Sequence, residues 1–114
     1  MNTLEAARQI IDALEDKKGE DIVLLDIHEI ASFTDYFIIC SGTSDRMLDS
    51  LADAVIEKAH ETLDIKRKAE GQASSGWLVI DLDDIVVHLL STDQRDYYRL
   101  EQLWDKGKVL LRLQ

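Results

Sequence analysis

Three aspartates, Asp81, Asp83 and Asp84, lie close together between two apolar runs. Carboxylates at such spacing can bind Mg²⁺ for phosphoryl or nucleotidyl transfer. Aspartate is also common in turns, because its side chain hydrogen-bonds the neighbouring backbone. No lysine or arginine lies nearby in the sequence to hold a triphosphate, so a turn is the favoured interpretation. A Mg²⁺-dependent nucleotidyltransferase or phosphohydrolase that uses Asp81 and Asp83 is the alternative.

A second candidate site is the segment at residues 41–44, Ser-Gly-Thr-Ser, which joins an apolar run to a helical pattern. Backbone N–H groups at a helix start can hold a phosphate. The segment lacks the lysine of a P-loop. A tight turn with a helix cap from Thr43 or Ser44 is therefore favoured.

The remaining reactive side chains show no catalytic or metal-binding pattern. His28, His60 and His88 have no zinc-ligand spacing, so a structural zinc site is not expected. The favoured interpretation of the chain includes no metal and no other cofactor. Cys40 lies within an apolar run, which favours a small buried side chain. A Cys–His nucleophile pair is the alternative, and no neighbouring residue supports it.

Aromatic and charged side chains in the second half suggest binding rather than catalysis. Trp77, Tyr97, Tyr98 and Trp104 are of the types that dominate protein interfaces. The helical spacing of Trp104 favours a core position, whereas Trp77 could face either way. Arg95 and Arg99 are one helical turn apart, with Asp96 and Glu101 nearby, and the simplest interpretation is a solvated helix face.

The elements that would position these residues follow from the apolar spacing. Stripes with helical period predict two long helices, one capped by Asn2 and stopped by Gly19, the other running from the Ser44 region to Leu63. A shorter helix is expected over 91–104, capped by Ser91. Apolar runs predict strands at 22–25, 36–40, 77–82, 85–90 and 109–113. Residues 71–76 form a loop by composition. The chain is therefore expected to be a single α/β domain with a mixed sheet of about five strands, two long helices and one shorter helix.

The two strands around Asp83 should form a hairpin with unequal faces. If Leu78 faces Leu89 and Ile80 faces Val87, one face is wholly apolar. The other face combines six side chains of mixed character: Trp77, Val79, Asp81, Val86, His88 and Leu90. We predict that the apolar face is core and the mixed face is a contact surface, where His88 could make binding depend on pH near 6.5.

Length and charge narrow the class of function. The 114 residues fit one domain, residues 1–114. The chain has 13 Lys and Arg against 23 Asp and Glu, a net charge of −10. The whole excess falls in residues 1–64, with 5 basic and 15 acidic residues, whereas residues 65–114 hold 8 of each. This charge opposes binding to nucleic acid or anionic membranes and favours basic proteins as partners.

One cysteine and the lack of a signal-peptide or membrane-span pattern predict a cytoplasmic protein.

A series of separated segments carries a family pattern: Asp35-Tyr36-Phe37-Ile38-Ile39 followed by Ser41-Gly42-x-Ser44, Glu70-Gly71, Trp77-Leu78-Val79-Ile80-Asp81, Val87-His88, Arg95-Asp96-Tyr97-Tyr98 and Leu100-Glu101-Gln102-Leu103-Trp104. In order and spacing they resemble the ribosomal silencing factor family, RsfS, also called Iojap, over nearly the whole chain. Two positions depart from that pattern. Asp83 stands where the family's hairpin usually has glycine, and Leu90 stands where phenylalanine is common.

The resemblance implies a nucleotidyltransferase-like fold without transferase activity. It also implies a factor that binds the large ribosomal subunit through ribosomal protein L-fourteen and stops the small subunit from joining. Translation is then repressed under nutrient limitation or in stationary phase. Free family members can self-associate, so a homodimer is expected when the factor is off the ribosome.

We therefore expect a non-enzymatic binding protein that acts as a steric block, with little direct contact to nucleic acid. The expected partner-binding residues lie on the mixed hairpin face and the helix after it: Trp77, Asp81, His88, Arg95, Asp96, Tyr97, Tyr98 and Glu101.

Overall fold

The computed structural model describes residues 2–99 and 106–113 of the chain. The elements in chain order are α1 (Thr3–Asp16), β1 (Glu20–Asp26), β2 (Tyr36–Gly42), α2 (Asp45–Leu63), β3 (Glu70–Gln72), a 3₁₀ turn η1 (Ala73–Ser75), β4 (Trp77–Asp81), β5 (Ile85–Ser91), α3 (Thr92–Tyr98) and β6 (Lys108–Leu113). The strands form one sheet in the order β3-β4-β5-β2-β1-β6. Only β2 and β5 pair in parallel within this sheet, so the predicted mixed α/β class is confirmed.

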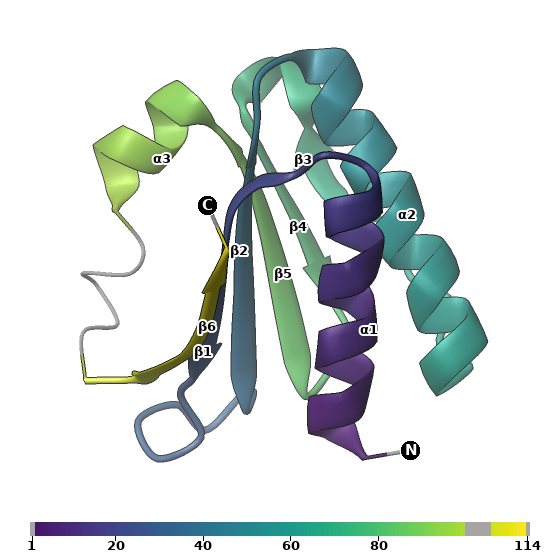
Figure 1. The fold of residues 1–114 in the computed structure, drawn as a ribbon, viewed down its shortest axis with the longest axis vertical. Helices are drawn as coiled ribbons and strands as arrows, with labels where there is room; N and C mark the ends of the chain where they lie inside the picture. The colour runs from purple at the N-terminus through teal and green to yellow at the C-terminus, as the bar shows by residue number, and fades with distance from the viewer. Residues whose placement is uncertain (1, 100–105, 114) are drawn as a thin grey trace.

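The helices are not distributed evenly over the sheet (Figure 1). Helices α1 and α2 run side by side along one face, where their apolar stripes pack on the central strands. The short α3 follows β5 directly and contacts the ends of β5 and β2. The face opposite α1 and α2, here called the second face, carries a smaller apolar cluster: Val23, Leu25, Ile27, Phe37, Ile39, Val86 and Leu90.

The central strands supply both clusters because their side chains alternate between the two faces. On β2, Ile38 and Cys40 belong to the cluster under the helices, whereas Phe37 and Ile39 belong to the second face. All four are at most 4% exposed. The continuous apolar runs in the sequence therefore correctly predicted strands that are buried on both sides.

The hairpin register also agrees with the prediction. Leu78 pairs with Leu89, and Ile80 pairs with Val87. These four side chains lie in the cluster beneath α1 and α2. Trp77 and Val79 pack against the cluster on the second face. The division of the hairpin into two unlike faces is thus confirmed.

Two parts of the chain differ from the prediction. The sheet has six strands rather than about five, because residues 70–75 contain β3 and η1 where a loop was expected. Helix α3 ends at Tyr98 rather than at Trp104, and Arg99 at the C-cap adopts the left-handed conformation with φ 47°. The predicted core position of Trp104 lies outside the described residues.

The end of α1 was also assigned to the wrong residue. Lys18, not Gly19, has the left-handed backbone conformation, with φ 65°. Gly19 is required for a different reason, since a Cβ there would lie 2.5 Å from Sγ of Cys40. The glycine therefore allows the chain to pass closely over β2 as it enters β1.

Candidate functional site

The second face carries a diagonal row of aromatic rings that crosses three strands. The ring of Phe33, in the loop after β1, lies 6.0 Å from that of Phe37 on β2. Phe37 meets His88 on β5 edge-on at 4.6 Å, and His88 lies 6.0 Å from Trp77 on β4. Such tilted and edge-to-face contacts are the favourable geometries for aromatic pairs. We call these four residues the aromatic row.

The aromatic row is buried at its centre and exposed at one end. Phe37 and His88 are 4% and 9% exposed, Trp77 is partly buried, and Phe33 is 60% exposed. Ile30 in the same loop is 40% exposed, so this loop places two large apolar side chains in contact with solvent. Sequence reasoning missed Phe33 and Phe37, because Phe33 lies in a polar connection and Phe37 inside an apolar run.

His88 is held in one protonation state by its surroundings. Indole Nε1 of Trp77 donates a hydrogen bond to Nδ1 of His88 across 3.2 Å, so Nδ1 carries no proton. Burial lowers the pKa of His88 from 6.5 to about 4. The neutral ring must then carry its proton on Nε2. Nε2 is buried and has no hydrogen-bond partner in the described part of the chain.

This placement overturns one expectation about His88. A histidine that is neutral down to about pH 4 cannot make binding depend on pH near 6.5. The physical reason is desolvation, because charging the ring would bury a cation in an apolar cluster. Within the described residues, the Nε2–H group of His88 is instead a buried, neutral donor without an acceptor.

The other residues expected at a contact surface occupy two places. Asp81 is exposed at the end of β4, on the same face as Trp77 and His88. Asp96 and Tyr97 lie on α3 and are both exposed. Tyr98 ends α3, but its side chain is outside the described part of the structure, and so is Glu101.

Arg95 does not lie on a solvated helix face, as the spacing had suggested. Its side chain is 7% exposed and points from α3 toward the start of β1 and the end of β2. Nη1 donates to Oγ of Ser41 at 2.9 Å, and Nη2 lies 3.4 Å from Oδ2 of Asp21. Sequence spacing could not reveal this, because Ser41 and Asp21 are far from Arg95 along the chain.

The hairpin aspartates are engaged in the turn itself. Oδ1 of Asp81 accepts the backbone N–H of Asp83 at 2.9 Å. Oδ2 of Asp83 accepts from Nη2 of Arg67 at 2.9 Å, and Asp83 has the left-handed φ of 71°. Among residues 2–99 and 106–113, no three His, Cys, Asp or Glu side chains converge as metal ligands would. The hydrogen bonds of Asp81 and Asp83 agree with the turn interpretation of this segment.

The 41–44 segment is likewise used for local structure. Oγ of Ser44 accepts the backbone N–H of Met47 at 3.1 Å and caps α2, as predicted. The backbone N–H of Thr43 donates to Sδ of Met47 at 3.3 Å. Cys40 is fully buried, and burial raises the pKa of its thiol to about 12, so it is a core residue without nucleophilic character.

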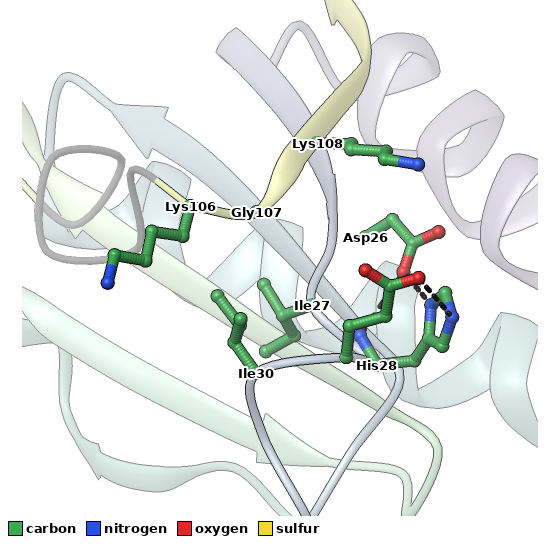
Figure 2. A pocket seen from close by; sticks show the side chains of 8 residues that line it. Asp26, Ile27, His28, Ile30, Lys106, Gly107 and Lys108 are labelled. Carbon is green, nitrogen blue, oxygen red and sulfur yellow. Dashed lines mark hydrogen bonds and ion pairs between the residues drawn. The ribbon is translucent and has the colours of Figure 1, made fainter.

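A small hollow lies where the loop after β1 meets the start of β6 (Figure 2). Nδ1 of His28 contacts Oδ1 of Asp26, and this carboxylate raises the pKa of His28 above 6.5. Lys106 and Lys108 extend on either side of the hollow. Its volume is about 20 Å³, which is too small for a substrate. None of the described helices is both long and apolar enough to cross a bilayer.

Comparison with known proteins gives a consistent match. The family model "Ribosomal silencing factor during starvation" matches residues 1–113. The ribosomal silencing factor RsfS of Bacillus subtilis is 38% identical over 104 residues, which cover 91% of this chain and 88% of the relative. A mouse relative named "Mitochondrial assembly of ribosomal large subunit protein 1" is 31% identical over 83% of this chain and 43% of its own length. A crystal structure of a Chromobacterium violaceum protein superposes with a TM-score of 0.86 at 37% identity, covering 92% of this chain and 88% of that one.

Proposed function

The chain belongs to the ribosomal silencing factor family, RsfS, and on that premise we propose that it docks on the large ribosomal subunit through the second face of its sheet. The docked domain then keeps the small subunit from joining and represses translation when nutrients are limiting. The proposed partner on the subunit is ribosomal protein L-fourteen. The protein would act in the cytoplasm, away from membranes.

The observation that carries this proposal is the aromatic row with its unused donor. A few residues supply most of the binding free energy at protein interfaces, and tryptophan is among the types enriched there. Here the aromatic rings lead from an exposed phenylalanine, Phe33, to a partly buried tryptophan, Trp77. Beneath them the Nε2–H group of His88 has no acceptor in the described chain. A buried donor left unpaired costs about 1–3 kcal/mol, so an acceptor brought by a partner would relieve that cost.

Charge supports a basic protein rather than RNA as the main contact. The net charge of −10 repels phosphate backbones and attracts basic surfaces. Ribosomal proteins are basic, and the name of the mouse relative refers to the large ribosomal subunit. Asp81, together with Asp96 on α3, would meet cationic groups at the edge of the contact. Little direct contact with nucleic acid is needed.

The proposed mechanism requires no chemical step. The radius of gyration is 12.6 Å and the largest extent 32 Å, so a bound domain fills the space in which two subunits would otherwise meet. The relation to nucleotidyltransferases that the resemblance implies would then concern the fold alone. In the absence of ribosomes, a second copy of the chain could cover the same apolar face, which accounts for the proposed homodimer.

Co-sedimentation with purified large subunits tests the proposed surface. Phe33→Ala and Trp77→Ala should each weaken binding, by about thirtyfold for the loss of a hot-spot side chain. His60→Ala is the matched control, because His60 is exposed on α2, on the other side of the sheet. If both aromatic variants remain folded and bind as tightly as the His60 variant, the second face is not the docking surface.

A further inference from the structure

Helix α3 is attached to the sheet by a charged side chain. Of the six α3 side chains that the structure describes, Arg95 alone is buried, whereas Thr92, Asp93, Asp96 and Tyr97 are exposed. A seven-residue helix is too short to be stable by itself, so its position depends on its tertiary contacts. The contact made by Arg95 is therefore the main candidate for what fixes α3.

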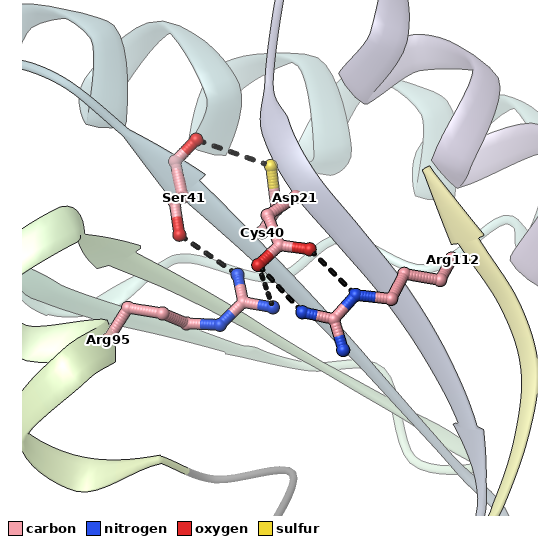
Figure 3. Close-up of polar contacts among 5 residues, drawn as sticks. All are labelled: Asp21, Cys40, Ser41, Arg95 and Arg112. Carbon is pink, nitrogen blue, oxygen red and sulfur yellow. Dashed lines mark hydrogen bonds and ion pairs between the residues drawn. The ribbon is translucent and has the colours of Figure 1, made fainter. Parts of the chain in front are cut away.

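The guanidinium of Arg95 is held by groups from β1 and β2 (Figure 3). Its Nη1 donates to Oγ of Ser41, and its Nη2 lies 3.4 Å from a carboxylate oxygen of Asp21. A buried guanidinium is strongly unfavourable unless a carboxylate and hydrogen-bond acceptors compensate for lost water. Asp21 supplies such a charge, and replacing it with a neutral residue would remove the ion pair across 3.4 Å from a guanidinium that is 7% exposed.

The same carboxylate also holds the far end of the chain. Nε and Nη2 of Arg112 on β6 donate to the two oxygens of Asp21 at 3.1 and 3.0 Å, a bidentate contact. Asp21 has a left-handed backbone, with φ 46°, at an irregular point in the pairing of β1 and β2. Aspartate adopts that backbone conformation more readily than most residues. In this conformation the carboxylate of Asp21 contacts both Arg95 and Arg112.

We infer that Asp21 is a positioning residue, which through Arg95 sets the place of α3 relative to the second face. This inference rests on the proposed function, because α3 carries Asp96 and Tyr97, two of the proposed contact residues. Tyr97 is 80% exposed, so its place depends on the helix rather than on packing of its own side chain in the core. Asp21 itself lies near the start of β1, and its proposed role does not require contact with the partner.

Two variants separate the roles of the two arginines. Asp21→Asn removes the charge that holds α3, whereas Arg112→Gln removes only the contact to β6 and leaves Asp21 and Arg95 in place. Hydrogen exchange should become about tenfold faster in residues 92–98 for Asp21→Asn. For Arg112→Gln the increase should be confined to residues 108–113. If Asp21→Asn does not fold, Ser41→Ala removes the hydrogen bond from Nη1 of Arg95 and allows the same comparison.

Binding to large subunits distinguishes positioning from general stabilisation. At a temperature where all variants are folded, Asp21→Asn should bind about tenfold more weakly, and Arg112→Gln less than about twofold more weakly. The double variant Asp21→Asn/Arg95→Gln should bind no more weakly than Arg95→Gln alone, because both changes release the same helix. Additive losses would overturn the inference.

Failure of the inference can be told apart from failure of the proposed function. If Trp77→Ala weakens binding and Asp21→Asn does not, Asp21 is not a positioning residue and the docking surface stands. If neither Trp77→Ala nor Phe33→Ala weakens binding, the docking surface is wrong, and a role for Asp21 in docking is overturned with it.

Discussion

The indole N–H of Trp77 points at Nδ1 of His88 from the neighbouring strand, 3.2 Å away. This single hydrogen bond fixes the tautomer of a buried histidine and joins Trp77, at one end of the aromatic row, to its neighbour in the row. It also makes the state of the imidazole measurable. His88 should be neutral, with its proton on Nε2, throughout the physiological pH range.

The pKa of His88 is lowered and that of His28 is raised, which gives the first prediction. In an NMR titration the ring of His88 should titrate near pH 4, because burial disfavours its charged form. The ring of His28 should titrate above 6.5, because the carboxylate of Asp26 stabilises its cation. Trp77→Phe, which removes the indole donor, should change the ¹⁵N shift of Nδ1 in His88. Titration of His88 near 6.5 would show that it is not buried as described.

The depressed pKa of His88 also predicts how stability varies with pH. Between pH 6.5 and about 4 the unfolded chain takes up a proton at His88 and the folded chain does not. The free energy of unfolding should therefore decrease as the pH is lowered from 6.5 to about 4, by up to about 3 kcal/mol from this residue. Denaturant unfolding of wild type and His88→Gln at several pH values isolates the effect. Parallel pH profiles for the two proteins would contradict it.

Much of the fold could be predicted because the apolar pattern is strong. The two long helices, the mixed sheet and the two unlike faces of the hairpin follow from periods of 3.6 and 2 in the sequence. Strand β3 could not be predicted, since its three residues, Glu70–Gln72, are all exposed and include a glycine. It is a strand only because β4 offers a free edge to pair with.

The candidate site was less predictable than the fold. Trp77, Asp81 and His88 were placed on one face from strand alternation alone, and the hairpin register confirms that shared face. That alternation gives the side of the sheet but not the depth, so the burial of His88 was missed. Arg95 was missed for a related reason, because its buried charge is compensated by Asp21 and Ser41 from distant strands.

Close packing at Gly19 gives a prediction about stability. A Cβ at this position would lie 2.5 Å from Sγ of Cys40 and 3.2 Å from a methyl group of Leu51. Gly19→Ala should therefore destabilise the protein by about 1–3 kcal/mol, as overpacking of a core does. Cys40→Ala removes the sulfur and should recover part of the loss in the double variant. Equal losses from Gly19→Ala in both backgrounds would mean that the sulfur is not the obstacle.

The hairpin turn tests the role of Asp83. Its φ of 71° is reached easily by glycine and at a cost by other residues. Asp83→Gly and Asp83→Ala both lose the ion pair with Arg67. Asp83→Gly should nevertheless be more stable than Asp83→Ala by about 1 kcal/mol, measured by thermal or denaturant unfolding. Equal stability of the two variants would show that backbone conformation does not limit this turn.

The second face as the docking surface is tested most directly by site-specific photocrosslinking. p-Benzoylphenylalanine is placed at position 33, at the exposed end of the aromatic row, or at position 60, on α2 on the other side of the sheet. Each protein is then irradiated with large ribosomal subunits. We predict a crosslink to a basic ribosomal protein of the large subunit from position 33 and none from position 60. A crosslink from position 60 alone would contradict docking through the second face.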